Sequence, residues 1–279
     1  MPRVVLSVVA LALVSAVSVS AQWPKYPAPG VPRDEKGQVR MDAPTPRMAN
    51  GKPDLSGNWV RFRGEGGLAR GRGAAPPPAD PNSPPIATFF ELGANIPGGL
   101  PFTPWAMEVR KKREAANAKD NPDALCLPMG ITQFHMHGQP RKMMQTPQLL
   151  AIMYEANYGL RYIYTDGRQL PPQGEPQPWW YGYSVGRWEG DELVVETNNL
   201  RDDGWLDVRG SPLTEQAKIL ERFRRPTYGK LEIDITIEDP KAYTKPFTVR
   251  VNQQISPDDE IIEFVCNENQ QFRKLIKID

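Results

Sequence analysis

The sequence contains two histidines, His135 and His137, which lie two residues apart. In an extended segment, residues at this spacing share one face, so both imidazoles could meet the same metal ion or substrate. Glu221 is a third candidate, because strand alternation places it between the apolar residues Ile219 and Phe223, where a carboxylate must be paired or have a raised pKa. These three polar residues form the predicted catalytic set, for acid–base or metal-assisted chemistry.

Each of these residues also has a structural interpretation. Backbone groups or carboxylates could satisfy the two histidines, and Glu221 could form an internal ion pair with an arginine. No H-E-x-x-H or Cys-x-x-Cys spacing supplies a third metal ligand, so no metal ligand is assigned. The sequence also has no G-x-S-x-G elbow, phosphate-binding loop or haem-attachment motif, and no cofactor is predicted.

Aromatic and very small residues alternate before a turn at Gly190-Asp191. This turn would pair the preceding segment with residues 192–197 as a hairpin. One face of the first strand then carries Trp180, Gly182, Ser184, Gly186 and Trp188. Three small residues between two indoles predict a slot, to be filled by a ligand, a partner or another part of the backbone. The predicted ligand-binding residues are Trp180, Tyr183, Ser184 and Trp188.

The elements that would position these residues are mostly strands. In the segment 231–237, isoleucine and leucine alternate with polar residues, which is typical of a sheet with one wet face. The predicted strands are 148–155, 161–165, 180–188, 192–197, 217–225, 230–238, 247–255, 260–266 and 271–277. Their short turns favour a mainly β fold, an antiparallel up-and-down meander that closes as a lipocalin-like (calycin-type) barrel or forms a strongly curled sheet. One helix is predicted over 104–119.

The chain divides into a signal peptide, an arm and one domain. Residues 1–21 contain Arg3, an apolar stretch and a small-residue cleavage site, which predict a secreted or periplasmic protein. Residues 22–52 are rich in proline and charge and predict an extended arm. The remainder, 53–279, is predicted to be a single β domain with an irregular loop over 64–85.

The charges nearly cancel, with 34 basic and 33 acidic residues. This balance provides no electrostatic footprint for nucleic acid, and no later apolar run approaches the roughly 20 residues of a membrane helix. Two cysteines in an exported chain predict either one disulfide, Cys126–Cys266, or two separate buried thiols. The oligomeric state stays open.

Several longer motifs are spread along the chain. They are Asp54-Leu-Ser-Gly-Asn-Trp59, Pro104-Trp105-Ala106, Cys126-Leu-Pro128, Gln145-Thr-Pro147, the run from Tyr183 to Thr197, Glu221-Arg-Phe-Arg-Arg225, and Glu238-Asp-Pro240 with Tyr243-Thr-Lys-Pro246. Together they resemble a large family of uncharacterised secreted bacterial proteins, over nearly all of the chain after the signal peptide. The resemblance implies export and a shared fold, and it transfers no activity and no catalytic residue.

Three functions fit these observations. The first is an exported protein that binds a small apolar, aromatic or glycoside-like molecule in a barrel pocket or groove. The second is a secreted lyase, isomerase or hydrolase that uses His135, His137 and Glu221, which requires the carboxylate to lie near an imidazole. The third is an envelope interaction protein, favoured if the Pro-rich arm fills the slot.

Overall fold

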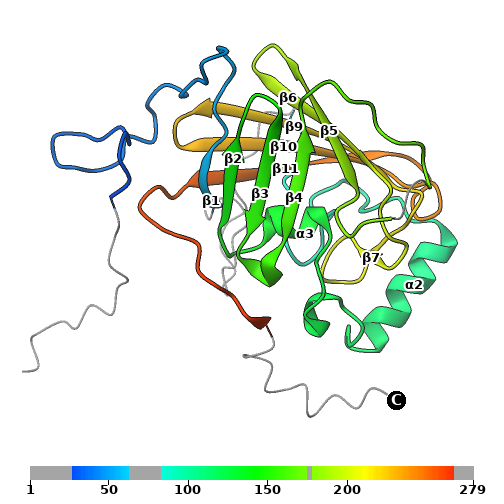
Figure 1. The fold of residues 1–279 in the computed structure, drawn as a ribbon. Coiled ribbons are helices and arrows are strands. Elements are labelled where there is room, and N and C mark those ends of the chain that lie inside the picture. The colour runs from blue at the N-terminus through cyan, green and yellow to red at the C-terminus, as the bar shows by residue number, and fades with distance from the viewer. Residues whose placement is uncertain (1–26, 63–82, 175–177, 267–279) are drawn as a thin grey trace, which may run out of the picture.

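Nine strands in the described part of the chain close into a β-barrel (Figure 1). The structure, a computed structural model, describes residues 27–62, 83–174 and 178–266. The strand order is β1-β11-β10-β9-β6-β5-β4-β3-β2. The bounds are β1 (Gly57–Arg61), β2 (Arg141–Gln145), β3 (Leu149–Tyr154), β4 (Leu160–Tyr164), β5 (Tyr183–Glu189), β6 (Glu192–Asn198), β9 (Lys218–Thr227), β10 (Lys230–Glu238) and β11 (Phe247–Ile255). This barrel confirms the predicted mainly β, lipocalin-like fold class.

The hairpin of β5 and β6 has the register that the sequence predicts. Ser184 lies opposite Thr197, and Gly186 lies opposite Val195. Gly190, in the turn, has a φ of +61°, a conformation that glycine adopts without steric cost. The interior face of these two strands could therefore be derived from the sequence.

One strand pair departs from an up-and-down meander. β4 and β5 run parallel, so the chain must return along the barrel before β5 begins. We call this return, residues 165–174 and 178–182, the crossover segment. It is fastened beside β6, since Asn198 Nδ2 donates to Pro171 O at 2.7 Å and Gly174 N donates to Asn199 Oδ1 at 2.6 Å. The crossover segment therefore forms a second layer against the outer wall of the barrel.

The described chain forms no strand over the predicted range 260–266, so that prediction is wrong. β11 already pairs with β1 on one side and with β10 on the other, so a following strand has no free ladder to join. The chain instead runs past β2 and β3. Lys142 and Glu260 form an ion pair at 2.9 Å, and Ile262 N donates to Glu155 Oε2 at 3.0 Å. The other predicted strand, 271–277, lies outside the described residues.

The predicted helix is present as α2 (Pro104–Ala115), and it ends earlier than residue 119. Thr103 caps its N-terminus by accepting a hydrogen bond from Ala106 N at 3.2 Å. Asn117 and Ala118 then adopt φ angles of +52° and +54°, which end the helix. α2 lies outside the barrel, beside the small hairpin of β7 (Gly204–Trp205) and β8 (Pro212–Leu213) (Figure 1).

A second helix, α3 (Ile131–Met136), replaces the extended segment predicted around the histidines, and all six of its residues are buried. Thr132 Oγ1 and Gln133 Nε2 donate to the carbonyls of Leu206 and Trp205, at 2.7 and 3.0 Å. These contacts to distant residues favour the helix over a strand. Neither α2 nor α3, the α-helices of the described residues, has the length and apolar character to span a membrane.

Cys126 and Cys266 form a disulfide across a sequence separation of 140 residues. This confirms the first of the two alternatives for the cysteines. Cys126 follows the short helix η1 (Asp123–Leu125) and precedes α3. The bond therefore ties the C-terminal end of the described chain to the segment that carries α3.

The described part of the Pro-rich arm packs against the turn between β9 and β10. Tyr228 N donates to Ala43 O at 2.8 Å, and Gly229 N donates to Met41 O at 2.9 Å. The arm is thus fixed to the barrel over these residues. The predicted signal peptide 1–21, the start of the arm and most of the irregular loop 64–85 lie outside the described residues.

Candidate functional site

Large side chains from the strands and from α3 occupy the interior of the barrel. Trp59, Phe134 and Phe223 are fully buried, and Trp59 Nε1 donates to Leu55 O at 2.9 Å. Further buried side chains on the interior faces include Met143, Ile152, Ile163, Leu193, Val195, Ile233, Ile235 and Val251. This interior is a packed core, as is common in small barrels.

A charged network crosses this core and contains two of the three predicted catalytic residues. His135 Nε2 lies 2.8 Å from Glu221 Oε1, and both side chains are completely buried. Arg161 Nη1 donates to Glu221 Oε1 at 3.0 Å, and its Nη2 forms an ion pair with the other carboxylate oxygen. Arg161 Nη2 also donates to Thr197 Oγ1 at 3.0 Å, and its Nε donates to Ser184 Oγ at 3.2 Å. The structural interpretation of Glu221, an internal ion pair with an arginine, is therefore correct.

The protonation states in this network follow from burial and from neighbouring charges. Burial alone would raise the pKa of Glu221, but Arg161 and the hydrogen bond from His135 lower it to about 2. Burial lowers the pKa of His135, and the hydrogen bond and charge of Glu221 oppose this only in part. The network therefore holds an ionised carboxylate, a guanidinium and a neutral imidazole whose Nε2–H donates to Glu221.

His137 lies apart from this network. Its Nδ1 accepts a hydrogen bond from Gln139 N at 3.2 Å, and its ring contacts the Phe89 ring edge-on at 5.3 Å. The guanidinium of Arg141 donates to the main-chain carbonyls of both histidines, at 2.6 Å to His135 and 2.9 Å to His137. α3 carries His135 and ends at Met136, and His137 is its C-cap, so the extended segment assumed for a shared face is not present and the two imidazoles have different partners. The catalytic roles stay predictions.

The burial of His135, which lowers the pKa of its imidazole, predicts a dependence of stability on pH. The unfolded chain binds a proton at a free imidazole below its ordinary pKa of 6.5, whereas the folded chain excludes it. Stability is therefore complete above about pH 6.5 and falls with decreasing pH, by about 1.4 kcal/mol per pH unit per excluded proton. We expect His135→Gln, whose amide can still donate to Glu221, to reduce this slope between pH 6.5 and 5 in urea unfolding.

His137→Gln serves as the control for this experiment, because it leaves the buried imidazole in place. The His137 variant should keep the part of the slope that belongs to His135. An unchanged slope in His135→Gln would contradict the neutral, proton-excluding imidazole.

The predicted slot beside the two glycines is filled by the chain itself. A Cβ at Gly186 would lie 3.1 Å from methyl groups of Ile163, Leu193 and Thr165. A Cβ at Gly182 would lie 2.7 Å from Thr197 Cγ2 and still closer to a backbone oxygen. Of the three occupants that the sequence left open, the chain itself is therefore the one observed beside these glycines. The alternation of side chains assumed for this strand does not extend back to Trp180. Gly182 has a φ of +60° and lies before β5 begins, so the residues before Tyr183 do not follow the strand pattern.

The four predicted ligand-binding residues lie in different surroundings. Ser184 is buried and bonded to Arg161, and Trp188 is half-buried against the core. The guanidinium of Arg201 lies over the Trp180 ring at 4.3 Å. The structure thus does not gather these side chains around one cavity. Their ligand-binding role stays a prediction, and Tyr183 alone comes near a groove.

A groove lies between the crossover segment and the outer wall of the barrel, and we call it the crossover groove. Its volume is about 500 Å³. Its lining residues are Leu170, Gln173, Arg187, Glu196, Thr197, Asn198, Lys218, Ile219, Leu220, Thr236 and Glu238. Arg187 forms ion pairs with Glu196 on the neighbouring strand and with Glu189. Sequence patterns do not predict this groove, because Leu170 and Gln173 of the crossover segment complete its lining and are not part of the strands that form the rest of it.

A second groove of about 270 Å³ shares Leu170, Arg187 and Glu196 with the first, and we call it the flanking groove. Its lining residues are Gly167, Arg168, Gln169, Leu170, Val185, Gly186, Arg187 and Glu196. Arg168 lines this groove, with its guanidinium 3.7 Å over the Tyr164 ring and its Nη1 donating to Tyr183 Oη at 3.0 Å. The Tyr183 ring stacks on the Tyr164 ring at 5.4 Å.

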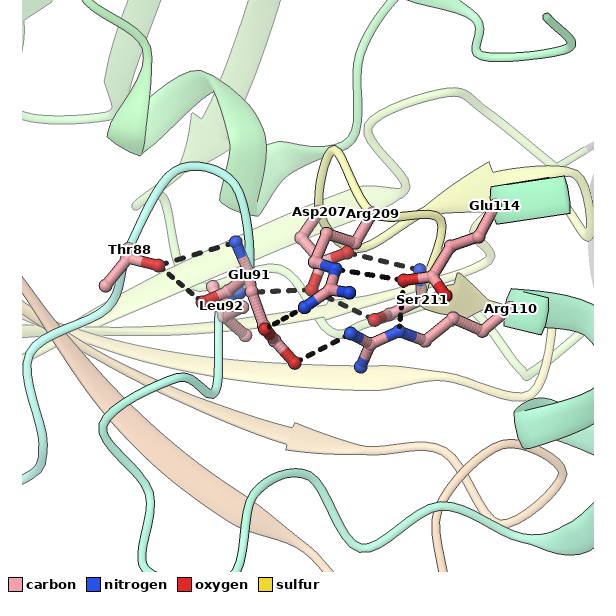
Figure 2. A network of polar contacts seen from close by, with 8 residues as sticks. All are labelled: Thr88, Glu91, Leu92, Arg110, Glu114, Asp207, Arg209 and Ser211. Atoms are coloured by element: carbon pink, nitrogen blue, oxygen red, sulfur yellow. Dashed lines mark hydrogen bonds and ion pairs between the residues drawn. The ribbon is translucent and has the colours of Figure 1, made fainter. Parts of the chain in front are cut away.

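Other polar clusters in the described residues have structural explanations. Figure 2 shows a network in which the two carboxylate oxygens of Glu91 pair with Arg110 and Arg209, each at 2.7 Å. Burial raises the pKa of Asp207, but that carboxylate accepts hydrogen bonds from Leu92 N at 3.0 Å and from Ser211 Oγ at 2.9 Å. The network ties the loop over residues 88–92 to α2 and to the turn after β7. A wider hollow, of about 670 Å³ beside residues 44–53, is crossed by ion pairs such as that of Arg47 with Asp191.

Metal ligation has no support in the described ranges, where no group of three or more His, Cys, Asp or Glu side chains could hold an ion. No family model matches the chain, and no curated protein matches it either. Fold and site alone therefore define the class: a disulfide-bonded closed β-barrel with a packed interior and grooves along its outer wall. The resemblance to the secreted bacterial family stays a prediction.

Proposed function

We propose that this protein is exported and binds a small, neutral, glycoside-like ligand in the crossover groove. The observation that carries the proposal is the composition of the groove. Its volume of about 500 Å³ lies within the range of roughly 300 to 1,000 Å³ that is typical of small-molecule sites. Apolar side chains of Leu170 and Leu220 line it together with charged groups from four strands, β5, β6, β9 and β10.

The charges of the crossover groove balance. Arg187 and Lys218 supply two positive charges, and Glu196 and Glu238 supply two negative charges. Arg187 is paired with Glu196, and Lys218 lies opposite Glu238 in the strand register. A ligand with a net charge would be attracted by one member of each of these two pairs and repelled by the other member. A neutral ligand with hydroxyl groups can accept from the cations and donate to the carboxylates.

The apolar part of the groove supports the same ligand class. A pyranose ring presents C–H groups on its faces and hydroxyl groups around its edge. Leucine side chains can cover the faces while the charged groups bind the edge. Because side chains fill the interior of the barrel, we place the ligand in the groove on the outer wall and not in a pocket inside the barrel.

Export is supported by the disulfide and by the N-terminal sequence. Disulfides persist in oxidising compartments and are rare where thiols are kept reduced. The bond between Cys126 and Cys266 therefore fits the predicted signal peptide. The third function, an envelope interaction protein, is favoured only if the Pro-rich arm fills the slot. Thr197 and neighbouring backbone, rather than the described part of the arm, lie beside Gly182, so the structure does not favour that function.

Isothermal titration with methyl glycosides tests this proposal. We expect neutral methyl hexosides to bind more tightly than glucuronate or glucosamine of the same size. Leu220→Gln removes the apolar part of the groove, and we expect it to weaken binding by about tenfold, or about 1.4 kcal/mol. The matched control is Met144→Gln, because Met144 is an exposed apolar residue on the outer face of β2 and lines neither the crossover nor the flanking groove.

Two results would contradict the proposal. One is the absence of binding by every neutral glycoside in a sample with intact far-UV and near-UV spectra. The other is an equal loss of affinity in Leu220→Gln and Met144→Gln, which would mean that the sugar binds elsewhere.

A further inference from the structure

We infer that the ligand is a neutral oligosaccharide that lies across both the crossover groove and the flanking groove. The inference rests on the proposed function and deepens it, since it names the length of the ligand. The two grooves share three lining residues, Leu170, Arg187 and Glu196. They therefore adjoin at the Arg187–Glu196 ion pair, and we treat the two neighbouring grooves together as one path along the outer wall.

The two grooves repeat the same chemistry. In the crossover groove the Arg187–Glu196 pair lies next to the apolar side chains of Leu170 and Leu220. In the flanking groove the lining includes Arg168 and Val185, and Arg168 forms an ion pair with the neighbouring Asp166. Each half of the path thus offers an arginine–carboxylate pair beside an aliphatic surface. A polymer of identical units presents hydroxyl edges and C–H faces at a regular interval, which suits a repeated lining.

The path carries almost no net charge along its length. Arg168 donates to both carboxylate oxygens of Asp166, with distances of 2.6 to 3.0 Å. Arg187 is likewise paired with Glu196 and Glu189. This internal pairing disfavours a polyanion such as a uronic acid polymer, because the cations are already neutralised. It leaves free donor and acceptor positions for the hydroxyl groups of a neutral chain.

Arg168 is also held in place before any ligand binds. Its guanidinium stacks 3.7 Å over the Tyr164 ring, and it donates to Tyr183 Oη at 3.0 Å. A side chain fixed by an aromatic ring, a hydroxyl and a carboxylate loses little conformational entropy when a sugar binds. Arg168 is therefore the residue that should distinguish long ligands from short ones.

Titration with a length series tests the inference. The probes are glucose and neutral malto- and cello-oligosaccharides of increasing length, with isothermal titration of the complete mature chain. We expect affinity in at least one series to rise by about tenfold between the single sugar and the length that fills both grooves, and then to level off. In Arg168→Ala this gain should shrink to about twofold or less.

Arg201→Ala is a matched control within the same chain. Arg201 is also paired with an aspartate two residues away, Asp203, and its guanidinium also lies over an aromatic ring, that of Trp180. It lines neither of the two grooves. We expect the Arg201 variant to keep the full gain with length.

The outcomes separate the two proposals. If single sugars bind at the crossover groove but affinity does not depend on length, the inference is overturned and the proposed function stands. If Arg168→Ala and Arg201→Ala lose the gain equally, the path through the flanking groove is also overturned. If no neutral sugar of any length binds, both proposals fall.

Discussion

Glu221→Ala is expected to lower the free energy of unfolding by about 3 to 5 kcal/mol, as is typical when one partner of a buried ion pair is removed. The substitution leaves the guanidinium of Arg161 uncompensated in a fully buried position, and it removes the acceptor of the His135 Nε2 proton. Urea unfolding followed by tryptophan fluorescence at pH 7 measures the change. If the loss of stability is large enough to prevent folding, the urea titration of the variant will show no cooperative unfolding transition.

Two further variants keep this prediction falsifiable. Asp203→Ala breaks an exposed pair, with side chains about half exposed, and should cost less than about 1 kcal/mol. The double variant Arg161→Met with Glu221→Leu removes both charges and should recover much of the stability that Glu221→Ala loses. Equal losses in Glu221→Ala and Asp203→Ala would contradict the buried network.

Replacing both cysteines by serine is expected to lower the free energy of unfolding by about 4 to 5 kcal/mol. The disulfide closes a long loop and so reduces the conformational entropy of the unfolded chain, and the unfolded chain regains this entropy when the bond is removed. The loop closed by the bond spans a sequence separation of 140 residues between Cys126 and Cys266. Unfolding of the oxidised protein, the reduced protein and the double-serine variant under the same conditions measures the effect.

The reduced protein and the double-serine variant should agree, and a reductant should not alter the variant further. A free energy of unfolding that is the same with and without the bond, within about 1 kcal/mol, would contradict the contribution assigned to the cross-link.

Strand alternation and turn chemistry allowed the hairpin of β5 and β6 to be predicted from the sequence. Gly190-Asp191 fixes a two-residue turn, and the register then follows because side chains alternate with a period of two. The same reasoning gives the interior face of β10, where Leu231, Ile233 and Ile235 are all fully buried. These features depend only on residues close together in the chain.

β4 shows why the interior of the barrel was harder to predict. Arg161 and Ile163 point inward and are buried, whereas Leu160 and Tyr162 point outward with 42% and 45% of their surface exposed. An arginine in a strand is usually expected on the wet face. The one available signal was Glu221, whose position on an apolar face requires a cationic partner. The sequence could not say which arginine supplies it.

The candidate site depends on contacts that no local pattern contains. The Arg187–Glu196 pair could be predicted as a cross-strand neighbour in the hairpin. Its place in a groove depends on Leu170 and Gln173, which reach the wall only because β4 and β5 run parallel. Similarly, α3 forms where its side chains bond Leu206 and Trp205, far along the chain.

The most direct measurement is an amide chemical-shift map recorded while a neutral oligosaccharide is titrated into isotope-labelled protein. Binding in the crossover groove predicts that the perturbed amides cluster at Leu170, Arg187 and Lys218, while those of His135 and Ile152 in the packed interior stay unchanged. Perturbations centred on the interior residues, or none with any neutral sugar, would contradict a binding site on the outer wall of the barrel.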